Sequence, residues 1–334
     1  MTDLVRDVVD EAAAHFGTTL AALTPMAGGH STTVYEFARD GTAHVLRIVA
    51  PNDEIRPADM EAIQAWLSYL ALQGAPVPEP LQTTNGKQVA LVTRPEGAYI
   101  AVASKKARGI RAETLSQAAW TAGYFRQLGR TAALLHRAAA GYRPPADLRR
   151  PDFLAIGTLF SAHQPATPIV MEQKHRVLTQ LGALPKPPAH YGMIHGDFHF
   201  GNFFVDPAAS YAVTVFDFDD CGYGWYMMDT ATLLFDVAVL YDGEDRMAFT
   251  QHFLHHYLSG YRQVLAIEPF WVAQLPHFLK LLEISYYAML APGYEAGDDG
   301  DWWVARFMPG RRERVEGNIP YLDLDPVAIL ETID

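Results

Sequence analysis

Strand-like and helix-like patterns follow one another in the first third of the chain. Residues 32–38 and 43–49 are rich in β-branched and aromatic residues, which favour strands. The dipeptide Asp40-Gly41 between them is a hairpin turn signal. In residues 57–73 the apolar side chains recur at the three- and four-residue spacing of one helix face. The pattern predicts a β-hairpin followed by one long helix.

Further strands are expected before residue 104. Asn85-Gly86 marks a second hairpin turn, with strands predicted at residues 88–93 and 99–104. Residues 3–16 have a helical pattern and precede the first strand. We therefore predict a small antiparallel sheet with one long helix in residues 1–104.

After residue 104 the pattern becomes mainly helical. Prolines between residues 144 and 165 predict a loop-rich connector, and residues 191–219 return to short strand-like segments. The chain is thus predicted to be an α+β protein of two parts, residues 1–104 and residues 105–334. The helices predicted for the second part cover residues 112–139, 227–240, 245–264, 269–290 and 301–316.

Composition and charge narrow the class of protein. Hydrophobic residues make up 49% and charged residues 19% of the 334 residues, which is typical of a globular protein. The net charge of −12 repels nucleic acid and anionic membranes, so neither is an expected partner. The single cysteine and an acidic N-terminus unlike a signal peptide predict a cytoplasmic location. Arg311, Arg312 and Arg314 are interpreted as solvated charges, and no pattern indicates an oligomeric state.

The candidate chemistry lies between two strand-like segments. The segment His195-Gly196-Asp197-Phe198-His199-Phe200-Gly201-Asn202 forms a polar loop, and Asp217 ends a β-type run fifteen residues after Asn202. Phosphoryl transfer needs a carboxylate to accept the acceptor's proton, and carboxylate and amide oxygens to bind magnesium. The spacing Asp-x-x-x-x-Asn matches the catalytic loop of protein kinases. Isolated Asp and Asn residues usually serve turns, but this combination favours catalysis.

These motifs resemble those of the aminoglycoside phosphotransferase and choline kinase superfamily, which has a protein-kinase-like fold. Within it, the chain is similar to bacterial members near stress-response kinase A and homoserine kinase type II. The likeness covers nearly the whole chain, and its loop motifs are specific for the superfamily but not for a substrate. The residues that carry it are Ile194 to Asn202, Val215 to Asp220, Gly222 to Gly224, Asp229, Leu128-Gly129 and Leu135-His136.

The resemblance implies roles for individual residues. Asp197 would be the catalytic base, and Asn202 and Asp217 would bind Mg²⁺, with ATP as the phosphoryl donor. Asp229 would brace the backbone of the catalytic loop. Asp219 would either assist near the metal or cap the loop before Gly222. A small-molecule hydroxyl acceptor would bind against the helical part, an amino alcohol or a homoserine-like or aminoglycoside-like compound.

A glycine pair precedes the first predicted hairpin strand. Gly28 and Gly29, with Ser31, would let backbone N–H groups approach the nucleotide phosphates. A lone glycine pair is usually an ordinary turn. Its position at the start of a kinase-like lobe strengthens the interpretation that it binds phosphate. The first part is therefore expected to bind ATP.

The expected phosphate-anchoring pair departs from the protein-kinase pattern. Arg47 stands on the third strand where protein kinases have lysine, and its planar fork binds phosphate with a different geometry. Its expected helix partner is Glu61, although the protein-kinase pattern favours the position of Ile63. We predict that Arg47 and Glu61 contribute to the nucleotide site.

Two other functions compete with a small-molecule kinase. A serine/threonine protein kinase is one, but the segment from Asp217 to Asp229 is short for a peptide-docking loop. A non-catalytic nucleotide-binding regulator is the other. The presence of all three polar residues of the catalytic set argues against it, whereas Arg47 in place of lysine favours it.

Overall fold

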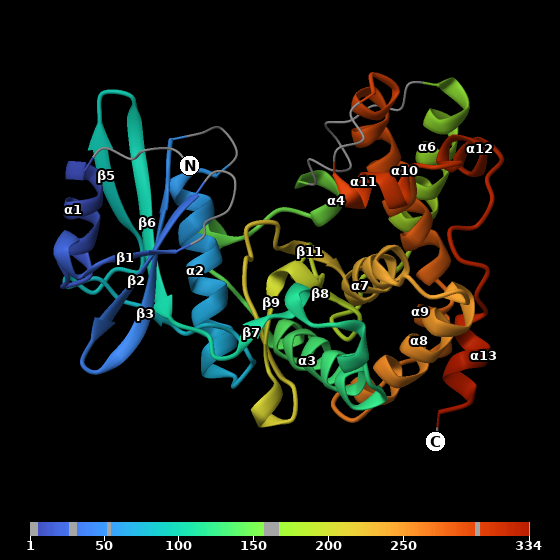
Figure 1. Ribbon diagram of the computed structural model, residues 1–334, viewed down its shortest axis with the longest axis horizontal. Helices are drawn as coiled ribbons and strands as arrows, with labels where there is room; N and C mark the ends of the chain where they lie inside the picture. Colours follow the sequence, from blue (N-terminus) through green and yellow to red (C-terminus); the bar gives the residue numbers. More distant parts are fainter. Residues whose placement is uncertain (1–5, 27–31, 52–54, 157–166, 298–300, 334) are drawn as a thin grey trace. The chain divides into compact units, whose positions relative to one another are not determined.

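The computed structural model describes residues 6–26, 32–51, 55–156, 167–297 and 301–333 (Figure 1). The chain divides into two compact units. Unit 1 contains the chain up to Gly109 together with residues 143–150 and 214–219, and unit 2 contains the rest. Unit 1 is built on an antiparallel sheet and unit 2 is mainly helical, so the predicted α+β class is confirmed. The sequence predicted one boundary at residue 104, and it did not predict that residues 143–150 and 214–219 would belong to the first unit.

Unit 1 is organised around a six-stranded antiparallel sheet. Its order is β1-β2-β3-β6-β4, and β5 pairs with β6 on the same sheet. The strands are β1 (Thr24–Met26), β2 (Thr32–Arg39), β3 (Thr42–Val49), β4 (Pro80–Leu81), β5 (Ala90–Arg94) and β6 (Gly97–Lys105).

The first predicted hairpin is confirmed. Arg39 pairs with Thr42, so Asp40 and Gly41 form a two-residue connection. Their φ angles are 51° and 71°. Positive φ at both central positions is the type I′ geometry that matches the twist of the two strands. The local sequence was therefore sufficient to specify β2, the turn and β3.

The second predicted hairpin is wrong in its connection. Asn85 and Gly86 do form a turn, in which the Thr83 N–H donates to the Lys87 carbonyl at 2.7 Å. However, β4 pairs with β6 and not with β5. The hairpin instead joins β5 to β6, where Arg94 pairs with Gly97. Turn chemistry fixes a local bend, whereas the pairing partner is decided by the whole sheet.

Two helices cover the two faces of this sheet: α1 (Arg6–His15) and α2 (Pro57–Leu72) (Figure 1). Alternate residues of β6 face each helix. Ala101 and Ala103 belong to the core under α1, and Ile100 and Val102 to the core that includes Met60 of α2. This alternation explains why both faces of the strand are apolar.

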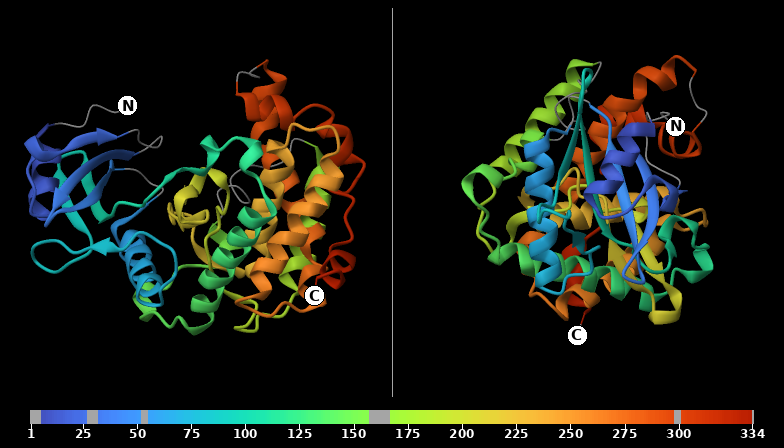
Figure 2. Two further views of the ribbon diagram at one scale, coloured as in Figure 1. Left: turned by 60° about the horizontal axis from the view of Figure 1, so that its bottom comes forward. Right: turned by 90° about the vertical axis from the view of Figure 1, so that its left-hand side faces the viewer.

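Unit 2 is mainly helical (Figure 2). The sequence predicted no helix where α6 forms, and Pro168 occupies the favourable first turn of that helix. Within the described residues, no helix is both long and apolar enough to cross a membrane. The helices are α3 (Ala122–Gly141), α4 (Phe153–Ile156), α6 (Pro168–Gly182), α7 (Tyr226–Leu240), α8 (Arg246–Arg262), α9 (Pro269–Val272), α10 (Leu275–Glu295), α11 (Trp302–Phe307), α12 (Arg311–Glu316) and α13 (Pro326–Glu331).

Short strands hold the polar loop in unit 2. The loop runs from β8 (Tyr191–Ile194) to β9 (Phe203–Asp206). Strand β8 pairs antiparallel with β11 (Gly222–Trp225), and α7 begins directly after β11. Strand β9 lies between β10 (Ala212–Val215) and β7 (Ile110–Arg111). Both ends of the loop are therefore anchored in sheets.

Candidate active site

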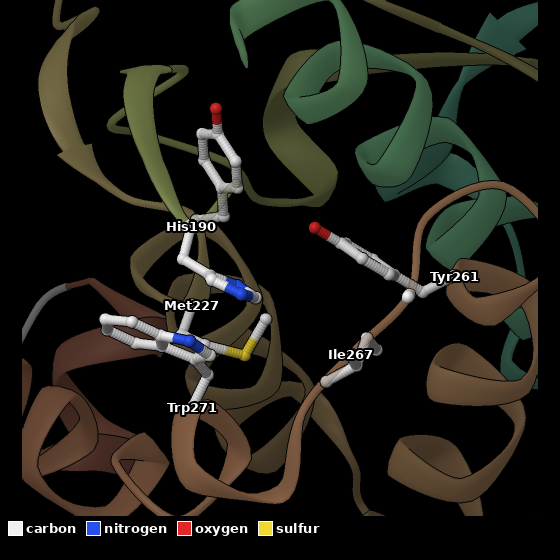
Figure 3. Close-up of a pocket in the computed structure, with 7 residues that line it drawn as sticks. His190, Met227, Tyr261, Ile267 and Trp271 are labelled. Atoms are coloured by element: carbon white, nitrogen blue, oxygen red, sulfur yellow. The ribbon is translucent and has the colours of Figure 1, made fainter. Parts of the chain in front are cut away.

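A pocket at the start of α7 lies apart from the predicted chemistry (Figure 3). His190 stacks on Trp271 with ring centres 4.7 Å apart, and Tyr226 stacks on the buried His136. None of the predicted site residues lines this pocket, and it contains no carboxylate. The lining residues are His190, Tyr226, Met227, Tyr261, Ala266, Ile267 and Trp271.

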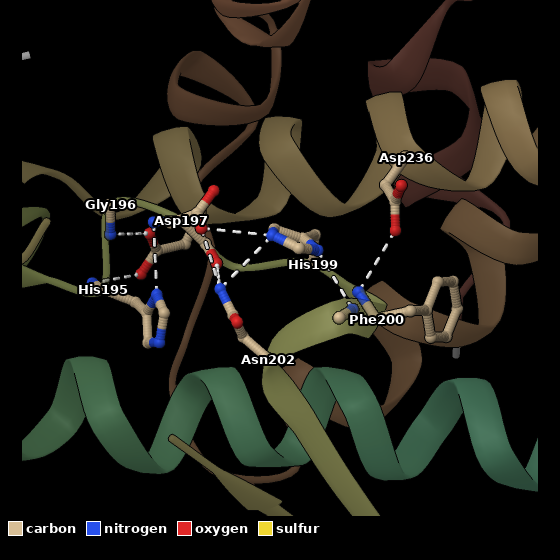
Figure 4. Close-up of polar contacts among 9 residues, drawn as sticks. His195, Gly196, Asp197, His199, Phe200, Asn202 and Asp236 are labelled. Carbon is tan, nitrogen blue, oxygen red and sulfur yellow. Dashed lines mark hydrogen bonds and ion pairs between the residues drawn. The ribbon is translucent and has the colours of Figure 1, made fainter. Parts of the chain in front are cut away.

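The structure brings together the two predicted residues of the catalytic loop. Nδ2 of Asn202 donates hydrogen bonds to Asp197, to the main-chain oxygen at 2.9 Å and to Oδ2 at 2.8 Å (Figure 4). Because its amide nitrogen is engaged in this way, the amide oxygen Oδ1 of Asn202 remains as a potential metal ligand. The spacing of five residues thus closes the loop on itself.

Asp197 is held in its ionised form. Burial would raise its pKa, but the His199 and His195 imidazoles and the hydrogen bonds from His199 and Asn202 outweigh it and lower the pKa. Both side-chain hydrogen bonds go to Oδ2. Within the described part of the chain, Oδ1 accepts no hydrogen bond. An ionised carboxylate with one oxygen open is suited to accept a proton.

Asp229 braces the loop, as predicted. Its two carboxylate oxygens accept hydrogen bonds from the N–H groups of His195 at 2.9 Å and Gly196 at 3.0 Å. His136 of α3 bonds the same carboxylate at 3.0 Å through Nε2. Asp229 is completely buried, and a buried charge is tolerated only when it is hydrogen-bonded in this way.

A second carboxylate on the same helix was not predicted. Asp236 comes seven residues after Asp229, about two turns later on the same face of α7. It accepts a hydrogen bond from the N–H of Phe200 at 3.1 Å. Burial raises the pKa of Asp236 to about 6. The available signal was an acidic residue at helical spacing from Asp229 in an otherwise apolar segment.

The imidazole of His199 was also missed as a site residue. Its Nε2 lies 3.1 Å from Oδ2 of Asp197, and its Nδ1 accepts a hydrogen bond from the N–H of Gly201 at 3.0 Å. Figure 4 shows this ring between Asp197 and Asp236. The sequence contained the residue within its main motif but offered no reason to assign it a role.

Unit 1 carries the other predicted groups. Asp217 has a φ of 65°, a left-handed conformation that costs free energy in residues other than glycine. Such backbone strain is found preferentially at functional sites. Nη1 of Arg47 lies 3.9 Å from Asp217. It also donates to Oδ1 of Asp219 at 2.8 Å, while Nη2 donates to Oδ2.

The expected pairing of Arg47 with Glu61 is wrong. Glu61 is exposed on α2, and Asp219 supplies the carboxylate that holds Arg47. Burial disfavours the guanidinium charge, but the hydrogen bond and the charges of Asp219 and Asp217 outweigh it and raise the pKa of Arg47. The role of Glu61 in nucleotide binding remains a prediction.

Two further observations concern the predicted ligands. Gly28, Gly29 and Ser31 lie outside the described residues. Among the residues that are described, no group of three or more His, Cys, Asp or Glu side chains could hold a metal. Magnesium at phosphoryl-transfer sites takes few protein ligands, because substrate phosphates and water complete its shell. An amide oxygen of Asn202 and a half-exposed carboxylate of Asp217 are chemically suitable for it.

Comparisons with known proteins agree with phosphoryl transfer as the reaction. Residues 22–267 match the model of a family described as the phosphotransferase enzyme family. Amicoumacin kinase from Bacillus subtilis (strain 168) is 29% identical, over 97% of this chain and 95% of that protein.

Solved structures give the same result for the fold. An amicoumacin kinase in complex with AMP-PNP, Ca²⁺ and Ami has a TM-score of 0.84 and 25% identity, covering 96% of this chain and 95% of that chain. A microcompartment-associated aminopropanol kinase has a TM-score of 0.73 and 21% identity, covering 93% and 98%. The second likeness concerns the fold alone.

The predicted enzyme class is thereby confirmed: the chain is a kinase, an enzyme that transfers a phosphoryl group. Its protein-kinase-like fold was also predicted correctly. The match extends over 246 of the 334 residues, from residue 22 to residue 267. The chain belongs to the phosphotransferase enzyme family.

Proposed function

We propose that the acceptor is a small hydroxylated amine, such as an amino alcohol or a homoserine-like or aminoglycoside-like compound. In this proposal ATP is the donor, Asp197 the catalytic base, and Asn202 and Asp217 the magnesium ligands. Arg47 and the glycine segment that includes Gly28 and Gly29 bind the nucleotide. Bound magnesium would neutralise charge on the transferred phosphoryl group.

The chemistry at Asp197 follows from its hydrogen bonds. His199 and Asn202 both use Oδ2, so Oδ1 is the oxygen that we assign to the acceptor hydroxyl. Orienting that hydroxyl and accepting its proton is the task of the kinase catalytic-loop aspartate. Asp229 fixes the main chain next to Asp197, because its carboxylate accepts hydrogen bonds from the N–H groups of His195 and Gly196.

The observation that carries the choice of an amine is the negative field around Asp197 in unit 2. Burial and the charges of Asp197, Asp236 and Asp220 all raise the pKa of Tyr286, so several carboxylate charges act at this hydroxyl. The Tyr286 ring packs against Trp303 with centres 5.2 Å apart. Carboxylates and aromatic rings together are the groups that bind ammonium ions.

Asp236 is the carboxylate that we assign to the amine. Its side chain is only partly buried and uses one oxygen for the Phe200 N–H. The raised pKa means that ionised Asp236 is poorly stabilised by its surroundings. A cationic ligand would supply the missing opposite charge. The named amicoumacin kinase relatives are consistent with a small-molecule acceptor.

A panel of paired acceptors tests the proposal. Each amine-bearing alcohol is compared with an analogue that lacks the amine, for example aminopropanol with propanol, and phosphate transfer from ATP is measured. We expect the amine to raise kcat/KM about ten- to hundredfold, because hydrogen bonds to charged groups contribute about 1.5–3 kcal/mol. Equal kcat/KM within the pairs would contradict the assignment of an amine acceptor.

Two variants separate the roles of the carboxylates. Asp236→Asn keeps an oxygen that can accept the Phe200 N–H but removes the charge, so it should raise KM for the amine acceptor and leave KM for ATP unchanged. Asp197→Asn should fold normally and lose at least about 10²-fold in kcat with every acceptor. A folded Asp197→Asn enzyme with near wild-type transfer would refute its assignment as the base.

A further inference from the structure

We propose that His199 is a positioning residue that orients the carboxylate of Asp197 for the acceptor hydroxyl. The inference rests on the proposed function, because it concerns the same phosphoryl transfer. It assigns a role to His199, which neither the loop motif nor the family likeness does. The ring's two nitrogen contacts and the space that Gly201 leaves for it support this role.

The hydrogen bonds define which nitrogen of His199 carries the proton. The N–H of Gly201 donates to Nδ1 at 3.0 Å, so Nδ1 must present a lone pair. In a neutral imidazole the proton is then on Nε2. Nε2 lies 3.1 Å from Oδ2 of Asp197 and donates to it, so the amide nitrogen of Asn202, 3.3 Å from Nε2, is a neighbouring donor and not a partner of Nε2. The main chain of the loop thus sets the tautomer that the catalytic carboxylate requires.

Two donors hold one oxygen of Asp197. Nε2 of His199 and Nδ2 of Asn202 both bond Oδ2, at 3.1 Å and 2.8 Å. A carboxylate with a single donor can rotate about its bond to Cβ, whereas two donors on one oxygen restrict this rotation. Oδ1 is then fixed in a direction set by the loop, and accurate orientation of reacting groups lowers the barrier.

The glycine of the motif makes room for the ring. A Cβ atom at Gly201 would lie 2.5 Å from Cε1 and 2.9 Å from Nδ1 of His199. Contacts this short do not occur, so an alanine in place of Gly201 would displace the imidazole. The same small residue therefore supplies the N–H that sets the tautomer and the space that the ring occupies.

His199 is also braced within its own short turn. Its N–H donates to the main-chain oxygen of Asp197 at 3.1 Å, and its own carbonyl accepts from the N–H of Asn202 at 2.9 Å. The adjacent Phe200 N–H is fixed by Asp236. The position of the ring relative to Asp197 is thus determined by the backbone and by α7, and does not depend on a flexible side chain alone.

Substitutions at His199 test the positioning role. His199→Ala should lower kcat about 10²-fold, the cost of a misplaced reacting group, and leave the affinity for Mg·ATP unchanged. His199→Gln keeps an N–H donor near the place of Nε2 and should recover most of this loss. The exposed His175 on α6 provides a matched control, and His175→Ala should behave as wild type. Equal activity of His199→Ala and wild type would overturn the proposal, and so would failure of His199→Gln to exceed His199→Ala.

A double substitution tests the link to Gly201. Gly201→Ala alone should lower kcat as His199→Ala does, because it displaces the ring. The double variant should be no worse than His199→Ala, because the ring that the added methyl group would strike is then absent. Losses that multiply would show that Gly201 acts independently of His199 and would overturn this part of the inference.

A measurement without turnover separates this proposal from the proposed function. In protein with isotope-labelled histidine, the nitrogen signals of His199, identified by their loss in His199→Gln, should show Nε2 protonated and Nδ1 unprotonated. A proton on Nδ1 would overturn the proposal even in an active enzyme. Failure of wild-type protein to phosphorylate any acceptor, with the expected tautomer present, would contradict the proposed function instead.

Discussion

Arg47 and Asp219 form a bidentate ion pair within unit 1, although they are 172 residues apart in sequence. The carboxylate of Asp219 also receives support through its main chain, because Arg150 donates to its carbonyl at 3.0 Å. Asp217 lies within ion-pair distance of the same guanidinium. Arg47 therefore stands beside the predicted metal ligand, as expected for a cation that shares the nucleotide phosphates with magnesium.

Replacing this arginine should affect the nucleotide and not the acceptor. We expect Arg47→Ala to lower kcat/KM for ATP about ten- to hundredfold, because charge-assisted hydrogen bonds contribute about 1.5–3 kcal/mol. KM for the acceptor should change little. Arg47→Lys should recover part of the loss, since lysine keeps the charge without the planar fork. Steady-state kinetics with each substrate varied in turn provides the measurement.

A second arginine of the same sheet is a suitable control. The Arg94 side chain is 21% exposed and that of Arg47 is 23% exposed, and Arg94 is ion-paired to Glu11 and Asp7 of α1. Arg94→Ala should leave the ATP dependence as it is in wild type. If Arg47→Ala also does so, another cation holds the phosphates, and Lys87, Lys105 and Lys106 become the candidates.

A buried charge cluster connects three elements of unit 2. Glu283 of α10 is completely buried and binds Lys280 at 2.8 Å and Arg311 of α12 at 2.5 Å. Lys280 also donates to the carbonyl of Ile319 in the segment before α13. The interpretation of Arg311 as a solvated charge was therefore wrong, because Glu283 and the rings of Phe307 and Tyr321 enclose it.

Removing the central charge of this cluster should destabilise the fold. Glu283→Gln leaves two buried cations without their carboxylate, and breaking a buried ion pair costs about 3–5 kcal/mol. Denaturant unfolding followed by tryptophan fluorescence measures the change in free energy. The exposed neighbour Arg312 serves as the comparison, since surface ion pairs contribute little. An unchanged unfolding midpoint for Glu283→Gln would show that the cluster is energetically neutral.

The predicted ligands of Mg·ATP are spread over the whole molecule. Asn202 lies on the catalytic loop and Asp217 follows β10, and the glycine segment precedes both by more than 150 residues. A ligand that binds only the folded chain stabilises it in proportion to its saturation. Binding of the metal–nucleotide complex should therefore be visible in thermal unfolding.

The melting temperature should rise with Mg·ATP and rise much less with ATP and a chelator. At 100 times the dissociation constant the stabilisation is about 2.7 kcal/mol. Asn202→Ala and Asp217→Ala should each lose most of the magnesium-dependent part, whereas Asp323→Ala, an exposed aspartate, should retain it. A full shift in both ligand variants would place the metal elsewhere.

Local sequence was sufficient wherever one short segment determines its own conformation. The type I′ turn at Asp40-Gly41 needs only two residues that tolerate positive φ. The apolar spacing in residues 57–73 produced α2 within one residue of its predicted end. The loop from His195 to Asn202 also follows from sequence, because Asn202 returns to Asp197 over five residues.

Tertiary structure decided which distant groups face one another. No local pattern states that Asp219 and not Glu61 reaches Arg47, or that Asp236 binds the Phe200 N–H. Periodicity shows which face of an element is buried, but the partner on that face depends on how the elements pack. The sequence by itself determined the elements and the catalytic spacing. Packing selected the ion partners, because desolvated charges are paired by the groups that folding brings next to them.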